Sequence, residues 1–214
     1  MRKKLTPEDL QNESEFELLT EISHHELREF VVSQITREKF IIRIYSVYQI
    51  AMVMLFTFVF TRGIVLAIKG FPELIITVGI AIACSLSVLV VIHETLHALA
   101  YLLFGARKIS FGSDLRKFIF YALADKQVLA PGAFRVVALM PFVVVKVFCL
   151  IAIIIFYGQN IVYFPMTVMC LHSLFCAGDM AMLAFYRLHR DKEIYNYDDK
   201  SKGKTYFYTR KIRT

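Results

Sequence analysis

The sequence predicts an all-α membrane protein with four transmembrane helices and a helical N-terminal region, and it allows a short β element between helices two and three. Hydrophobic residues make up 57% of the 214 residues and the mean hydropathy is +0.55, which is typical of an integral membrane protein. A spanning helix needs about 20 mainly apolar residues. The stretches that meet this requirement are residues 44–68, 74–104, 136–157 and 161–186.

Basic residues predict how these spans are oriented. Lysine and arginine gather before residue 44, between residues 105 and 132, and after residue 186. Because basic loops stay on the cytoplasmic side, we expect a multi-pass protein of the cell membrane with both termini in the cytoplasm. The net charge of +7 then reflects this topology and contact with the anionic headgroups of the lipid bilayer. No basic folded domain is visible, so we expect no nucleic-acid partner.

Composition divides the chain into three regions. Residues 1–43 are expected to form a cytoplasmic amphipathic helical region, residues 44–186 the four-helix membrane domain, and residues 187–214 a basic cytoplasmic tail. The tail is polar and expected to be loosely ordered, although residues 205–208 have the aromatic content of a strand. The first residues lack an apolar core directly behind their basic residues, so we expect no cleaved signal peptide.

The second predicted span carries the motif His93-Glu94-Thr95-Leu96-His97. Two histidines four residues apart share one face of a helix, so both imidazoles can bind a single Zn²⁺. Glu94 is then placed to take a proton from a zinc-bound water. Charged groups inside a spanning helix are rare and usually functional. The motif therefore predicts a zinc hydrolase within the membrane; the competing interpretation is a set of polar residues that pack helices together.

A catalytic zinc usually has three protein ligands, so a third ligand must come from another span. Asp179 lies about 18 residues from the outer end of the fourth span and His93 about 19 from that of the second, which places them at similar depth. His172, Cys176 and Asp179 follow the i, i+4, i+7 spacing of one helix face. We expect Asp179 to bind the metal and His172 to support the ligands or touch the substrate. His172 itself and Cys176 stay open as candidate extra ligands. Alternatively, Asp179 pairs with Lys146 in the third span.

These residues resemble those of known families. His93 to His97 near the cytoplasmic end of one helix, followed two helices later by Gly178-Asp179, resembles the site-2 protease fold of intramembrane zinc metalloproteases. The sequence is more similar to a small bacterial membrane family described as putative zincin peptidases, over residues 74–186. The resemblance implies that His93, His97 and Asp179 bind zinc and that Glu94 activates water. Site-2 proteases have an asparagine where this chain has His172, a difference that concerns substrate handling more than metal binding.

The connection between spans two and three, residues 105–132, is a candidate for substrate recognition. Residues 117–123 have strand-like aromatic and branched side chains. An edge strand here would pair with an extended peptide. An amphipathic segment at the membrane surface fits the same residues equally well.

The sequence thus predicts an intramembrane zinc metallopeptidase that hydrolyses peptide bonds of membrane-embedded or juxtamembrane substrates. The alternative is a non-catalytic membrane protein that uses the same polar site, either a scaffold that holds a partner helix or a metal carrier. A carrier needs a polar path to the outer face. The outer halves of spans two and four offer little beyond Ser85, Ser87 and Thr167, which makes the carrier the weaker alternative.

Overall fold

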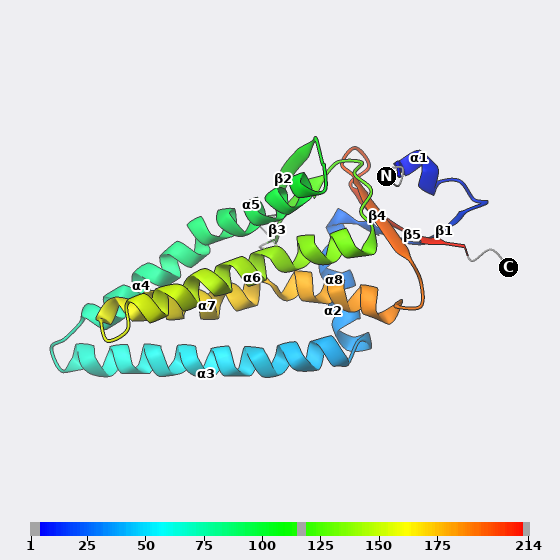
Figure 1. Cartoon of the computed structure of the whole chain (residues 1–214). Helices are drawn as coiled ribbons and strands as arrows, with labels where there is room; N and C mark the ends of the chain where they lie inside the picture. The colour runs from blue at the N-terminus through cyan, green and yellow to red at the C-terminus, as the bar shows by residue number, and fades with distance from the viewer. Residues whose placement is uncertain (1–4, 115–118, 212–214) are drawn as a thin grey trace. The chain divides into compact units, whose positions relative to one another are not determined.

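The computed structural model describes residues 5–114 and 119–211 (Figure 1). Its α-helices are α1 Pro7–Leu10, α2 Leu27–Arg37, α3 Phe40–Ile68, α4 Glu73–Leu86, α5 Val88–Leu103, α6 Pro131–Ile155, α7 Tyr163–Phe175 and α8 Ala177–Leu188. Single 3₁₀ turns occur at His24–Glu26 and Asn160–Val162. The strands are β1 Phe16–Ser23, β2 Ile109–Asp114, β3 Ile119–Ala124, β4 Ile194–Asp199 and β5 Lys204–Arg210. The protein is therefore mostly helical, as predicted, but the all-α fold class omits two antiparallel sheets.

The chain divides into two compact units. The sheet unit consists of residues 1–39, 94–138 and 181–214, and the helical unit of residues 40–93 and 139–180. Three of the four unit boundaries fall inside α5, α6 and α8, and the fourth lies between residues 39 and 40, where α3 begins.

The apolar helices agree only in part with four straight spans. α3 and α6 are each long and apolar enough to cross a membrane. α4 and α5 meet the requirement only as a pair bent by 42°, and the segment from Asn160 through α7 pairs with α8 at a bend of 45°. The predicted straight spans 74–104 and 161–186 are therefore both broken. At the first break, the hydroxyls of Ser85 and Ser87 each donate to a carbonyl one turn earlier at 2.7 Å, an arrangement that commonly bends helices.

The helical unit packs α4 against α3 and α7, and α3 against α7 (Figure 1). Val59, Leu74 and Val78 form its buried core. Gly63 allows the close approach of α3 to α4, because a Cβ at this position would lie 2.8 Å from a methyl group of Leu74. Many other apolar side chains of α3 are exposed, which suits a helix that faces lipid.

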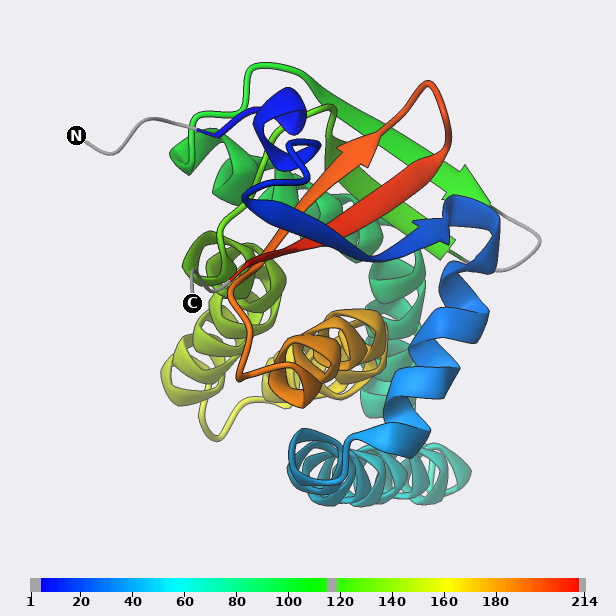
Figure 2. The ribbon, with the colours of Figure 1, turned by 90° about the vertical axis from the view of Figure 1, so that its right-hand side faces the viewer.

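The sheet unit contains a three-stranded antiparallel sheet in the order β1-β5-β4 and a two-stranded sheet of β2 and β3 (Figure 2). Phe16 of β1 pairs with Arg210 of β5, so the two ends of the chain share one sheet. Buried side chains from α1 and all three strands form its core: Leu10, Phe16, Tyr195, Tyr197, Tyr206 and Tyr208. The N-terminal region, expected to be helical, thus contains β1 as well as α1 and α2. The tail is not loosely ordered, and the strand allowed at residues 205–208 lies within β5.

The first helix has a complete N-terminal cap, and one smaller prediction about local structure is confirmed. Thr6 caps α1, with Pro7 in its first turn and a reciprocal hydrogen bond to Asp9. The short β element between the second and third apolar segments exists as the β2–β3 hairpin. Residues 119–123 of the predicted strand lie in β3, whereas residues 117 and 118 lie outside the described residues.

A carboxyl group in the sheet unit gives a pH-dependent prediction. Burial raises the pKa of Asp198 to about 6; a hydrogen bond from Thr205 Oγ1 at 2.6 Å opposes the rise, and the nearby Asp125 carboxylate adds to it. From about pH 4 to about pH 6 the folded protein keeps a proton that the unfolded chain releases, so the free energy of unfolding falls as the pH rises.

We expect Asp198→Asn to remove this loss, because an amide cannot ionise but still accepts from Thr205. The variant should unfold like the wild type near pH 4 and be more stable above pH 6, by at most about 3 kcal/mol. Thermal unfolding in detergent between pH 4 and pH 8 measures the difference. A difference that does not change with pH would contradict the assignment.

Candidate metal centre

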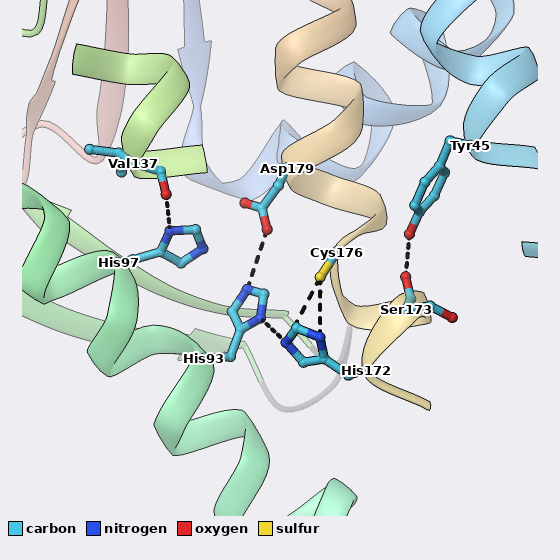
Figure 3. Close-up of polar contacts among 8 residues, drawn as sticks. All are labelled: Tyr45, His93, His97, Val137, His172, Ser173, Cys176 and Asp179. Atoms are coloured by element: carbon cyan, nitrogen blue, oxygen red, sulfur yellow. Dashed lines mark hydrogen bonds and ion pairs between the residues drawn. The ribbon is translucent and has the colours of Figure 1, made fainter. Parts of the chain in front are cut away.

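Helix α5 presents the two motif histidines one turn apart. His93 and His97 are both buried, and the helix is continuous from Val88 to Leu103. Within the sheet unit, Nδ1 of His97 lies 3.0 Å from the carbonyl oxygen of Val137 (Figure 3). A carbonyl only accepts, so Nδ1 carries the proton and Nε2 carries the lone pair. Histidines that bind metals commonly donate their second nitrogen to a carbonyl in this way.

The break between α7 and α8 places Asp179 beside His93. α7 ends at Phe175, α8 begins at Ala177, and Asp179 lies in the first turn of α8, where the helix dipole favours a carboxylate. Its Oδ2 lies 3.4 Å from Nε2 of His93 (Figure 3). Nitrogen and oxygen ligands of a tetrahedral zinc, at about 2.0–2.2 Å from the ion, lie about 3.4 Å apart. The observed distance therefore fits two ligands of one ion.

The other nitrogen of His93 faces His172, which in turn lies beside Cys176. Nδ1 of His93 lies 3.1 Å from Nε2 of His172, which is fully buried in α7. Cys176, in the break itself, has its Sγ 3.7 and 3.9 Å from the ring nitrogens of His172. The expected i, i+4, i+7 face of the fourth span is interrupted at Cys176, yet its three residues gather around the His93 ring (Figure 3).

Comparison with known proteins assigns the chain to a family. The model of a family described as "Putative zincin peptidase" matches residues 86–193, which is half of the chain and includes both motif histidines, Glu94 and Asp179. The chain belongs to this zincin peptidase family. No curated protein and no solved structure matches the chain. The family's description as a zincin implies zinc as its metal.

The residues present at this site fit zinc. Imidazole nitrogens and a carboxylate are the ligands of many catalytic zinc sites. His97 has the tautomer that offers Nε2 to a metal, and His93 has the same tautomer when its Nδ1 donates to His172. These residues are therefore of the types that bind zinc, and the spacing of His93 and Asp179 within the helical unit is that of two ligands of one ion.

Two α3 side chains stabilise the break that positions Asp179. Tyr45 donates its hydroxyl proton to the carbonyl oxygen of Ser173, and Gln49 donates to the same oxygen at 3.1 Å. Ser173 lies in the last turn of α7, where helix carbonyls lose their intrahelical partners. Figure 3 shows the Tyr45 bond. Both bonds satisfy a buried acceptor at the bend between α7 and α8.

Lys146 contacts groups other than Asp179, with which the alternative interpretation paired it. Its ammonium group donates to the carbonyl oxygen of Met169 and lies over the rings of Tyr48 and Phe142, at 5.5 and 5.6 Å from their centroids. These contacts satisfy the cation within the helical unit. The contact of Asp179 with His93 is thus favoured over an Asp179–Lys146 pair.

Sequence reasoning missed Tyr45, Gln49 and the carbonyl of Val137. Tyr45 and Gln49 are four residues apart in an apolar helix, and this spacing of polar groups is a signal that could have been recognised. The Val137 carbonyl has no sequence signal, because every residue carries one. Only the fold shows which carbonyl faces His97.

Proposed function

We propose that this protein is an intramembrane zinc metallopeptidase that hydrolyses peptide bonds of membrane-embedded or membrane-proximal substrates. The observation that carries the proposal is the 3.4 Å spacing of His93 Nε2 and Asp179 Oδ2 within apolar helices, with His97 one turn further along α5. Polar groups in such helices are unfavourable in lipid unless they pair, bind a ligand or face water, so a ligand-binding role explains their presence.

Each residue of the proposed site has one role. His93, His97 and Asp179 hold Zn²⁺, which when bound polarises the scissile carbonyl and lowers the pKa of water. Glu94 accepts the proton of the attacking water and later returns it to the leaving nitrogen. His172 orients the His93 ring by accepting from its Nδ1–H.

The β2–β3 hairpin supports a mode of substrate binding. Among the described strands, β2 pairs with β3 alone, which leaves the other edge of β2 for an added strand. Phe111 on this strand is largely exposed. An extended substrate paired with β2 would exchange its helical hydrogen bonds for sheet bonds, which exposes the scissile amide. We place this hairpin and both termini on the cytoplasmic side, as the basic residues indicate.

The test uses cells and purified protein together. Membrane proteins that accumulate both in cells lacking the protein and in cells producing only the Glu94→Gln variant are the expected substrates. The purified enzyme in lipid nanodiscs should cleave these proteins, lose activity to a zinc chelator and regain it with Zn²⁺. If the purified protein binds zinc but cleaves nothing, and if its loss causes no membrane protein to accumulate, it is instead a non-catalytic scaffold.

A further inference from the structure

Each ring nitrogen of His93 faces a different partner. Nε2 lies 3.4 Å from Oδ2 of Asp179, and Nδ1 lies 3.1 Å from Nε2 of His172 (Figure 3). A neutral imidazole carries its proton on one nitrogen and a lone pair on the other. A proton on Nδ1 can be donated to His172, and a proton on Nε2 can be donated to Asp179. The surroundings therefore accept both tautomers of His93, and each tautomer offers a ligand atom on the opposite side of the ring.

The Nδ1 side of the ring has its own set of ligand atoms. His172 and Cys176 are both fully buried, and one ligand atom from each lies within 4.8 Å of the others and of His93. In a tetrahedral zinc site, two nitrogens are about 3.3 Å apart and a nitrogen and a sulfur about 3.5 Å apart, given bond lengths of about 2.0 and 2.3 Å. The observed 3.1 Å between the histidines and 3.9 Å from Cys176 Sγ to Nε2 of His172 are close to these spacings.

We propose that Nδ1 of His93, Nε2 of His172 and Sγ of Cys176 form a second cation position, one that takes a thiophilic divalent ion such as Zn²⁺ or Cd²⁺. The thiol of Cys176 loses its proton to solvent as the metal–sulfur bond forms, because the thiolate is the ligand. His93 then holds its remaining proton on Nε2 and donates it to Asp179, the carboxylate–histidine arrangement that orients many metal ligands.

The two positions compete for one imidazole. A neutral His93 ring offers one lone pair, so a cation bound through Nδ1 takes His93 away from the position that uses Nε2 and Asp179. The thiolate-bound state is therefore a resting state without hydrolytic activity. This consequence rests on the proposed function, whereas the binding of a cation by His172 and Cys176 does not.

Cobalt spectroscopy tests the second position. The full-length protein in lipid nanodiscs is stripped of metal and loaded with Co²⁺, which shows a near-ultraviolet charge-transfer band when a thiolate binds it. We expect this band in the wild type and its loss in Cys176→Ser. Cys170→Ser is the matched control, because Cys170 is a buried cysteine of α7 less than two turns before Cys176, and it should keep the band, as should Glu94→Gln.

A measurement on the wild type alone keeps the test valid if a variant does not fold. X-ray absorption at the cobalt edge of the same sample should show a sulfur neighbour at about 2.3 Å, the length of a metal–thiolate bond in zinc proteins. Absence of this neighbour, or a band that survives in Cys176→Ser, overturns the proposal. Glu94-dependent cleavage without the band refutes only the second position, and the band without cleavage refutes only the peptidase.

Discussion

Glu94→Gln should abolish peptide hydrolysis and leave the zinc content of the purified protein at the wild-type level. Glutamine keeps the size and shape of the side chain but cannot accept a proton from water, so the loss should be about 10²–10⁴-fold or more. His93, His97 and Asp179 are unchanged in this variant, so metal binding should not weaken. Elemental analysis measures the zinc, and mass spectrometry of the products measures the cleavage.

The matched control is Glu73→Gln, which removes an exposed carboxylate at the start of α4. This variant should retain both zinc and activity, since Glu73 is remote in sequence from the motif and lies at a helix end. A Glu94→Gln enzyme that cleaves as fast as the wild type would show that another group takes the proton. A variant that loses its zinc would show that Glu94 supports the metal instead.

Asp179→Ala should weaken zinc binding by at least about 100-fold, the upper end of what loss of a residue that only orients a ligand costs. The carboxylate lies 3.4 Å from Nε2 of His93, and its loss leaves the proposed position with two protein ligands. His93→Ala and His97→Ala should weaken zinc binding to a similar degree. Competition with a chromophoric chelator measures the affinities in detergent or nanodiscs.

Lys146→Met separates this result from the alternative in which Asp179 and Lys146 form an ion pair. Methionine keeps most of the buried volume, and Lys146 contacts the Met169 carbonyl and two aromatic rings. We therefore expect normal zinc affinity, together with a lower unfolding temperature because the Met169 carbonyl loses a donor. Zinc binding that depended on Lys146 and not on Asp179 would contradict the proposed ligand set.

The fold was predictable where its signals are local. Hydropathy located the apolar segments, because a helix in lipid must be apolar over its length. The predicted third span, 136–157, overlaps most of α6, and the first, 44–68, lies within α3. The breaks at Ser87 and Cys176 were missed, since a hydropathy window averages over the one or two residues at which a helix changes direction.

The sheets were hidden for a different reason. β1 pairs with β5 across almost the whole chain, from Phe16 to Arg210. A strand near the N-terminus gains its partner only when the C-terminal tail folds back, so neither segment shows the pairing in its own sequence. The polar composition of the tail suggested loose order. Four of the six buried residues in the core of this sheet are nevertheless tyrosines of the tail.

The sequence alone determined that the chain has helices apolar enough to cross a membrane and a pair of histidines on one helix face, because hydropathy and helical periodicity are properties of neighbouring residues. It also identified Asp179, a rare acid in an apolar segment. Only the tertiary structure decided which groups meet: the Asp179 contact with His93, the support of the break by Tyr45 and Gln49, and the approach of His172 to the far side of the His93 ring. Such contacts join residues far apart in the chain, and the packing of helices, which no local pattern encodes, sets their distances.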